Sequence, residues 1–523
     1  MKVSLRYLLL FILSLLWFHI FVGVSALNPF NYTWLRGDGV IHLYGWLFYQ
    51  GSDWGMPWTY FDHLAYPVGV LSVQLDVIPL IALAVKSITH EPVQYFGLWL
   101  FSCFFLMLAF GEKILRAVGY EDIEACLFSS FFVLSTPFLN RFDHASLSAH
   151  WVFLCLILWG MVGSNRLKNF LFVGLLLCFL TGVHPYLFAM VGGIFIVWLV
   201  TDRSLKFYVK LPLTVLLFGS ALGLLAGYGY FSLKSGTGYG FGSYNMDLLG
   251  WFNSQGRSLF VPGLRSHGGS YESLSYLGLG LIISIIAGVI WGRKSEQRFS
   301  SLFVKGLVVS FVLCLLYSYM DKIRFGGNII LDLEGVLAPF KSITSSLRVS
   351  GRFIWPFFYL IIVWYLFKVH NWCPNRKWRN LILIFVLGVQ LVELWPMRRP
   401  EVTFSPEKLM EIRRYLKGSE LLSFQPAYVG FFEDGTRCFP EGAYNESEAS
   451  WVLVAAALEK VKTSAGYFAR AQDVHKILCS ADPAHADVVV YSKSSGAAIK
   501  APNISTGCLE LESLIICKSG KSI

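Results

Sequence analysis

The sequence predicts an all-α polytopic membrane bundle of about eleven spans, followed by a small C-terminal α/β domain outside the membrane. Of its 523 residues, 55% are hydrophobic and only 15% are charged, whereas a soluble domain carries about 25% charged residues. The apolar residues gather in blocks, and a block of about 18 or more can cross a bilayer. These blocks stop near residue 397, where charged residues become more frequent. We therefore assign residues 1–397 to a transmembrane domain and residues 398–523 to a separate domain.

Eleven apolar blocks account for the transmembrane domain. In chain order, we expect spans near 7–27, 92–111, 124–139, 147–164, 168–184, 186–201, 210–231, 274–292, 302–319, 353–370 and 380–397. The first block could instead be a cleaved signal peptide, because the letters VSA before Leu27 resemble a cleavage site. Its apolar core is longer than that of a usual signal peptide, which favours a retained helix.

The apolar segment 70–87 is a further span candidate, but it contains Asp76 and Pro79. A crossing here would invert every later loop against the charge rule for membrane proteins. A re-entrant or surface-lying helix fits better, with Asp76 as a residue that could cap it.

The formal net charge is +10, which in a soluble protein would suggest nucleic acid as a partner. Here the lysines and arginines cluster in short loops between alternate spans, and short basic loops stay in the cytoplasm. We therefore expect no nucleic acid partner and use the charge to orient the chain. The long loops 28–91, 232–272 and 320–352, together with the C-terminal domain, are predicted to lie outside the cytoplasmic (inner) membrane.

The C-terminal domain has the pattern of a mixed α/β fold. Residues 405–418 predict an amphipathic helix with Ser405 as its N-cap, and 485–494 and 511–520 predict short strands. Four cysteines fall in this domain, and in an oxidising compartment they can form two disulfides in one of three pairings. They are Cys438, Cys479, Cys508 and Cys517.

The turn between the third and fourth spans is unusually polar. Its letters NRFDHASLSAH, residues 140–150, contain Arg141, Asp143, His144 and His150 between two apolar blocks. Ionisable residues at membrane depth are costly and usually face a cavity or a pathway. The turn is therefore a candidate functional segment.

Other ionisable residues are predicted on the same outer face. They are Asp38 and His42 after the first span, His184 at the end of the fifth, Glu272 at the mouth of the eighth, and Arg348 and Arg352 at the mouth of the tenth. Simpler roles exist for each: an arginine can anchor to headgroups, a histidine before proline can satisfy a broken helix, and an aspartate between glycines can serve a turn. These roles do not account for the gathering of acids, histidines and arginines on one face. Such a mixture suits acid–base chemistry beside an anionic group.

Three arrangements in the chain resemble the GT-C class of integral-membrane glycosyltransferases. One N-terminal span leads into a long outer loop with an early acid, here Asp38 in RGDG; a polar turn follows at 140–150; and the bundle ends in an outer domain. More narrowly, segments such as RGDGVIHLYGW, YESLSYLGLG and LRVSGRFIWP resemble a family of uncharacterised bacterial membrane proteins that is grouped with GT-C-like enzymes. The likeness covers roughly residues 8–397.

The resemblance implies that a sugar is taken from a polyprenyl-phosphate donor on the outer face. An outer-loop carboxylate would act as a base or bind a divalent cation such as Mg²⁺ or Mn²⁺. Asp38 stands where this carboxylate is expected, although this chain has GD instead of the paired DE of protein mannosyltransferases. Asp143 is the alternative base, and His144 is a further catalytic candidate beside it.

The remaining candidates would bind substrate. Arginines suit a lipid phosphate because the guanidinium can donate two parallel hydrogen bonds to it, and histidines could orient the acceptor or complete a metal site. These substrate-binding candidates are His42, Arg141, His150, His184, Glu272, Arg348 and Arg352.

The sequence thus predicts a membrane glycosyltransferase that moves a sugar from a lipid-linked donor to a glycan or lipid acceptor of the cell envelope. One alternative is a transporter or flippase of lipid-linked glycan, which predicts charges in mid-membrane and a repeat between halves. The polar groups here lie at span ends instead. The other alternative is a non-catalytic envelope assembly protein, which would not need clustered acids and histidines.

Overall fold

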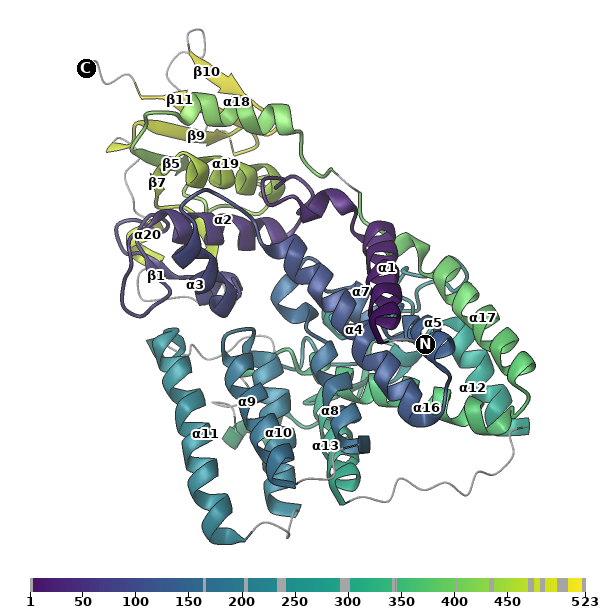
Figure 1. Ribbon diagram of the computed structural model, residues 1–523. Coiled ribbons are helices and arrows are strands. Elements are labelled where there is room, and N and C mark those ends of the chain that lie inside the picture. The colour runs from purple at the N-terminus through teal and green to yellow at the C-terminus, as the bar shows by residue number, and fades with distance from the viewer. Residues whose placement is uncertain are drawn as a thin grey trace.

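The chain folds as a helical bundle with a mixed sheet and its neighbouring helices at one end (Figure 1). We call the end of the bundle where this sheet lies the α/β end. The computed structural model describes residues 3–519 apart from 163–165, 202–205, 233–240, 292–301, 341–343, 345, 401, 432–436, 469–474, 480–484 and 496–506.

Five segments of the described chain are long and apolar enough to cross a membrane. They are α1 (Val3–Phe21), α4 (Phe96–Val118), η3 (Ala145–Ser148) together with α8 (Trp151–Val162), α11 (Phe207–Gly227), and η8 (Ser350–Ile354) together with α16 (Trp355–Trp372). Four other predicted spans are shorter apolar helices, namely α9 (Arg166–Thr181), α10 (Pro185–Thr201), α12 (Leu279–Trp291) and α13 (Leu302–Ser318), while α17 (Arg376–Glu393) covers most of the last one. The prediction of a helical membrane bundle is confirmed, and the count of eleven spans is not.

The predicted span 124–139 is broken into three short helices. They are α5 (Asp122–Phe128), α6 (Ser130–Val133) and α7 (Thr136–Leu139). The hydroxyls of Ser129 and Ser135 donate to the carbonyls of Cys126 and Phe132, which offers the backbone an alternative to the helical ladder. The segment is buried among other helices, so its apolar letters reflect protein packing as well as membrane depth.

The segment 70–87 does not form a spanning helix. It contains β2 (Val70–Leu71), η2 (Ser72–Leu75) and all but the last residue of α3 (Pro79–Ile88). A helix of ten residues is about 15 Å long, half of what the hydrocarbon core requires. This outcome agrees with a short helix that does not cross.

The first long loop folds against the C-terminal sheet. It contains η1 (Val24–Leu27), α2 (Asp38–Gly51) and β1 (Tyr60–Phe61), which pairs antiparallel with β2. Nearly every side chain of α2 is buried, because α2 packs against α19 (Glu446–Leu458) on one side and η2 on the other (Figure 1). The rest of the connections hold η4 (Tyr230–Ser232), η5 (Leu248–Trp251), η6 (Gly268–Ser273), β3 (Lys322–Phe325), β4 (Asn328–Asp332), α14 (Glu334–Leu337), η7 (Ala338–Phe340) and η9 (Trp395–Met397).

The C-terminal part is a five-stranded mixed sheet in the order β10-β11-β9-β5-β7. Its strands are β5 (Leu421–Gln425), β7 (Lys462–Thr463), β9 (Val488–Ser492), β10 (Cys508–Glu510) and β11 (Leu514–Lys518). β5 runs parallel to β7 and β9, whereas β11 runs antiparallel to β9 and β10. A smaller parallel pair joins β6 (Val429–Phe431) to β8 (Gly466–Phe468). The strands predicted in 485–494 and 511–520 are confirmed as β9 and β11.

The predicted helix of this part is α18 (Pro406–Leu416), and its N-cap is confirmed because the Ser405 hydroxyl accepts a hydrogen bond from the Lys408 backbone N–H at 3.2 Å. The four cysteines form two disulfides. Cys438 pairs with Cys479 at the end of α20 (His475–Cys479), with Cα atoms 5.4 Å apart. Cys508 and Cys517 lie opposite each other on β10 and β11, with Cα atoms 4.4 Å apart.

Candidate functional site

A polar pocket of about 210 Å³ lies at the α/β end of the bundle. Residues far apart in the sequence line it, and most of the predicted site residues are among them. The charged and imidazole side chains of its lining are Asp38, His42, Asp76, His144, His184, Glu272, Arg348 and Arg352. We call this cavity the polar pocket.

The start of α2 supplies two of these side chains. α2 begins at Asp38, directly after Gly37, whose positive φ of 51° favours glycine. An acid in the first turn of a helix is stabilised by the helix dipole. His42 follows one turn later, so both side chains project from the same face of α2.

Two loop residues and one turn residue complete the imidazole-rich wall. Asp76 ends η2 in the left-handed conformation (φ 50°, ψ 24°), which aspartate tolerates better than most residues. His144 lies in the turn between α7 and η3, and His184 lies between α9 and α10, where Pro185 starts the next helix. The chain therefore brings three separate connections to one point.

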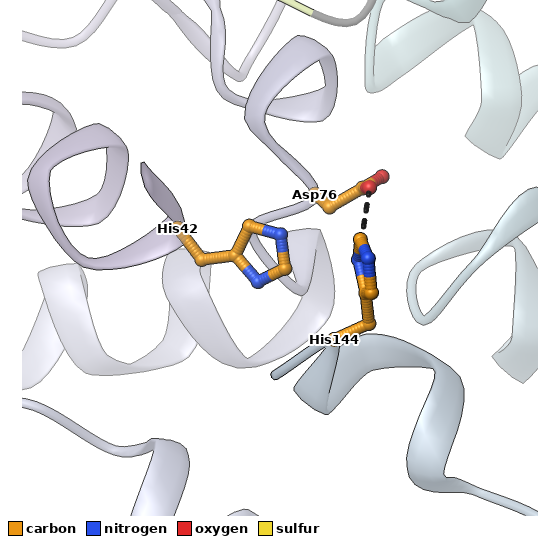
Figure 2. Close-up of side chains that lie close together, drawn as sticks. All are labelled: His42, Asp76 and His144. Carbon is orange, nitrogen blue, oxygen red and sulfur yellow. Dashed lines mark ion pairs between the residues drawn. The ribbon is translucent and has the colours of Figure 1, made fainter. Parts of the chain in front are cut away.

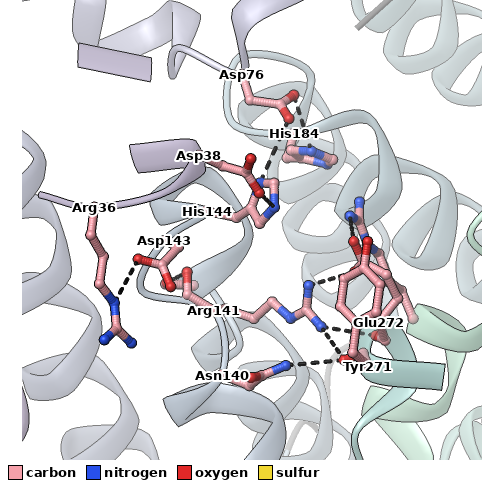
Figure 3. A network of polar contacts seen from close by, with 12 residues as sticks. Arg36, Asp38, Asp76, Asn140, Arg141, Asp143, His144, His184, Tyr271 and Glu272 are labelled. Atoms are coloured by element: carbon pink, nitrogen blue, oxygen red, sulfur yellow. Dashed lines mark hydrogen bonds and ion pairs between the residues drawn. The ribbon is translucent and has the colours of Figure 1, made fainter. Parts of the chain in front are cut away.

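These groups form a carboxylate–histidine cluster, defined as Asp38, His42, Asp76, His144 and His184. Figure 3 shows all of them except His42. His144 bridges the two acids, with its Nε2 2.7 Å from Asp38 Oδ2 and its Nδ1 3.9 Å from Asp76 Oδ2. His184 Nε2 lies 3.5 Å from Asp76 Oδ1. The Tyr186 backbone N–H donates to His184 Nδ1, which leaves the proton of a neutral ring on Nε2, facing Asp76.

The surroundings shift the pKa values of the cluster members in different directions. Burial raises the pKa of Asp38, but the hydrogen bond and charge of His144 outweigh it and lower the pKa overall. Burial and the neighbouring His144 lower the pKa of His42 to about 4. For His144, burial lowers the pKa, but the hydrogen bond with Asp38 raises it above its usual value. At neutral pH the cluster thus has two ionised acids and a neutral His42, while His144 holds its proton more tightly than an ordinary histidine.

Three members of the cluster fit a divalent cation. One ligand atom from each of His42, Asp76 and His144 lies within 4.8 Å of the others (Figure 2). Nδ1 of His42 and Nδ1 of His144 are both buried and make no hydrogen bond within the described part of the chain. Two imidazoles and one carboxylate suit Mn²⁺ or Zn²⁺ better than Mg²⁺, which prefers an all-oxygen shell. Asp38, the predicted metal-binding acid, lies beside this trio through its contact with His144.

The opposite wall of the polar pocket holds a buried ion triad. Glu272 accepts from Arg141 Nη1 at 2.6 Å and from Arg352 Nε and Nη2 at 3.1 and 3.0 Å (Figure 3). The Arg352 guanidinium lies over the Tyr186 ring, 4.7 Å from its centre. Two cations and one anion leave the triad with a net charge of +1, which is a suitable counterpart for an anionic ligand.

Three predicted residues do not line the polar pocket. Arg141 contacts the pocket lining through the Glu272 carboxylate and through the backbone carbonyls of Tyr271 and Glu272. Asp143 instead pairs with Arg399 Nη2 at 2.6 Å and with Arg36 Nε at 3.4 Å, so it ties the turn to the segment after α17. His150 is fully buried.

The environment of His150 is that of a core residue. Its Nδ1 lies 2.7 Å from the Tyr359 hydroxyl, and its ring packs on Trp355 with centres 4.4 Å apart. The residue stands at the start of α8 inside the bundle, which turns it away from the pocket. Its place is therefore structural, in contrast to the substrate-binding position predicted from the sequence.

The sequence interpretation missed Asp76 as a site residue. An acid inside the apolar run VLSVQLDVIPL was a usable signal, but its capping role was the simpler explanation. It also missed the aromatic part of the lining, which consists of Tyr186, Tyr230, Tyr244 and Tyr271. Tyrosine is common in outer loops, so its letters alone carried no positional signal.

A family model described as "Domain of unknown function (DUF6311)" matches residues 11–395. A search of curated proteins found no match. Two similar solved structures are both of the oligosaccharyltransferase of Archaeoglobus fulgidus. One is tethered to an acceptor peptide containing the NVT sequon, at 12% identity and a TM-score of 0.39, over 89% of this chain and 64% of that one. The other is a complex with Zn and sulfate, at 13% identity and a TM-score of 0.39, over 92% of this chain and 68% of that one.

Proposed function

The chain belongs to the family described as a domain of unknown function (DUF6311), and we propose that it is a membrane glycosyltransferase. In this proposal it moves a sugar from a polyprenyl-phosphate-linked donor to a glycan or lipid acceptor, at the α/β end of the bundle. That end would face the outside of the cytoplasmic membrane. The observation that supports the proposal is the polar pocket, which sets a carboxylate–histidine cluster opposite a buried cationic triad at the ends of membrane helices.

Asp38 is the proposed base. Its side chain is 41% exposed, so an acceptor hydroxyl can reach it, and its lowered pKa keeps it ionised at neutral pH. The acceptor oxygen attacks C1 of the sugar and loses its proton to Asp38, while the bond from C1 to the phosphate oxygen breaks and its electron pair leaves with the phosphate. A phosphate is a good leaving group, so a weak base is sufficient. Attack opposite the leaving group inverts C1.

Arg348 and Arg352 are the proposed partners of the leaving phosphate. Both line the same polar pocket as Asp38. Glu272 holds two nitrogens of Arg352 and so fixes the plane of its guanidinium before substrate arrives. A cation fixed in advance stabilises charge that develops on the phosphate without a cost of reorganisation.

The trio of His42, Asp76 and His144 would hold a divalent cation. When bound, such an ion supplies positive charge that neutralises the donor phosphate. His42 is ready for this role as a neutral imidazole, whereas His144 must first release its proton. Asp76 keeps His184 oriented through its second oxygen.

The test compares two identical chemical changes in the purified protein. The enzyme in proteoliposomes receives a panel of polyprenyl-monophosphate hexoses and pentoses with an envelope lipid extract as acceptor, and transfer is followed by mass spectrometry. Asp38→Asn should lower turnover by a factor of about 100 to 10,000, the usual cost of losing a general base. Asp143→Asn, whose carboxylate lies outside the polar pocket, should leave turnover of the folded protein intact.

Two outcomes would contradict the proposal. Normal turnover of Asp38→Asn with loss in Asp143→Asn would place the base in the 140–150 turn. Movement of the lipid-linked sugar across the bilayer without transfer to an acceptor would show that the protein is a flippase and not a glycosyltransferase.

A further inference from the structure

Apolar side chains are exposed on connections that do not span the membrane. At the α/β end, Met56 is 77% exposed and Phe231 is 63% exposed, and Trp58 and Leu80 are also exposed. We call these four residues the apolar rim. Exposed apolar residues that lie together on loops indicate a partner surface.

The backbone fixes the height of the apolar rim relative to the membrane helices. The Trp58 N–H donates to the Gly227 carbonyl at the end of α11 at 2.9 Å, and the Trp58 ring meets the Tyr228 ring edge-on at 5.7 Å. The Leu80 N–H donates to the Gly182 carbonyl, in the turn between α9 and α10, at 2.9 Å. The rim therefore lies at the depth where these helices end.

The surface below the apolar rim is also apolar. α11 is a candidate span, and only 17% of the residues in its most apolar stretch are buried within the protein. Its exposed residues include Leu211, Val215, Leu216 and Leu222, and the rim residue Phe231 follows four residues after the helix ends. The apolar rim follows directly on the exposed apolar face of α11. If lipid surrounds that face of α11, lipid also surrounds the rim.

We propose that the apolar rim inserts into the lipid leaflet on the α/β side and sets the mouth of the polar pocket at headgroup depth. Tryptophan favours this interface because its ring is apolar with one polar N–H group, and phenylalanine and leucine favour burial at the boundary between headgroups and acyl chains. The partner is therefore the bilayer surface, and a second protein is the alternative that the experiment must exclude.

The chain connects the apolar rim directly to the polar pocket. Trp58 is followed by β1, which pairs with β2, and β2 leads into the pocket residues Val73 and Asp76. On the other side, Phe231 is adjacent to Tyr230, which lines the pocket. A substrate whose polar head lies among lipid headgroups would thus reach the pocket from the side, without leaving the leaflet. The insertion itself does not depend on the proposed enzymatic activity.

The experiment places the photo-crosslinking residue p-benzoylphenylalanine at single positions of the full-length protein. Met56 is the first test site and Phe231 the second. Met410 on α18 is the matched control, because it is also an exposed methionine at the α/β end but lies in the C-terminal part. The variants are reconstituted in vesicles of phosphatidylcholine and phosphatidylglycerol, irradiated, and analysed by mass spectrometry of intact protein and peptides.

Lipid adducts should form at Met56 and Phe231 with several-fold higher yield than at Met410. Adduct yields at Met56 and Phe231 equal to that at Met410 would overturn the proposal, and so would crosslinks from these sites to another polypeptide in place of lipid. Both test sites are exposed, so the substitution leaves the packing unchanged, and a normal unfolding midpoint in detergent verifies this for each variant.

Discussion

Glu272→Gln is the change that most directly probes the polar pocket. The substitution keeps the shape of the side chain and removes its charge, while Arg141 and Arg352 stay in place. All three side chains are less than 10% exposed, with 7% for Glu272, 3% for Arg141 and 8% for Arg352. Little water therefore reaches the three side chains, and it replaces the lost carboxylate only in part.

The expected loss of stability follows from the hydrogen bonds in the triad. The carboxylate accepts three bonds from guanidinium groups, at 2.6, 3.1 and 3.0 Å, and a bond to a charged group contributes about 1.5–3 kcal/mol. Glutamine has one acceptor oxygen and turns an N–H₂ group toward a cation. Removing one partner of a buried ion pair costs about 3–5 kcal/mol, so we expect the free energy of unfolding to fall by about that amount.

The pH dependence of this loss has a definite sign. Burial alone would raise the pKa of Glu272, but the charges of Arg352 and Arg141 lower it well below the usual range. A lowered pKa of an acid contributes stability above the unfolded-state pKa, and that stability is lost as the pH falls through the folded-state pKa. The difference between the wild type and Glu272→Gln should therefore persist from pH 7 to about pH 5.

The assay is unfolding in detergent micelles, followed by intrinsic fluorescence during a denaturant titration. Glu512→Gln is the control, since Glu512 is 78% exposed and pairs only at the surface, with Lys408; this variant should unfold like the wild type. The double variant Glu272→Gln with Arg141→Met removes one of the unpaired cations and should regain part of the lost stability. An unchanged unfolding midpoint of Glu272→Gln, or purely additive losses in the double variant, would refute the reasoning.

Three further outcomes are expected. Asp143→Asn should lower the free energy of unfolding by about 3 kcal/mol, since Arg399 is buried and loses its partner; equal unfolding curves would contradict this. The affinity for Mn²⁺, measured by calorimetry, should rise as the pH rises through the pKa of His144, because a bound ion displaces the imidazole proton. Burial lowers this pKa, but the hydrogen bond with Asp38 raises it above its usual value. An affinity that does not change with pH would show that His144 is not a ligand of the ion. Replacing both Cys438 and Cys479 by alanine should cost about 4 kcal/mol, as the disulfide closes a loop with a sequence separation of 41; a loss below about 1 kcal/mol would show that the loop is already constrained in the unfolded chain.

The gathering of most of the site residues at one end of the bundle could be predicted from the sequence, and the direction of each side chain could not. Apolar blocks must end where the bilayer ends, so Asp38, His184 and Arg352 were expected at one level. Within the turn 140–150, however, neighbouring residues face different partners. His144 points to the polar pocket, whereas Asp143 turns to Arg399. No periodicity exists in such a turn from which these directions could be read.

The same limit explains the errors in the helical part. The run 124–139 is apolar enough for a span, but hydroxyl groups at Ser129 and Ser135 compete for backbone carbonyls and divide it into short helices. In the C-terminal part, local signals were stronger. The Ser405 cap and the valine-rich strand β9 were both evident, because they depend on adjacent residues alone.

The C-terminal part also explains how residues 106 positions apart, Asp38 and His144, meet at 2.7 Å. The segment after α17 contacts both of their chain segments. Thr403 bonds to the backbone of residue 33, five positions before Asp38, through its N–H at 2.7 Å, and Arg399 holds the residue next to His144. α19 then packs along α2, where the Tyr44 hydroxyl accepts from the Tyr467 N–H at 3.1 Å. The sheet and its helices therefore act as a brace across the polar pocket that several contacts hold at once. Loss of the Asp143–Arg399 pair alone leaves the other contacts in place, whereas loosening the brace as a whole should separate Asp38 from His144 before the membrane helices unfold.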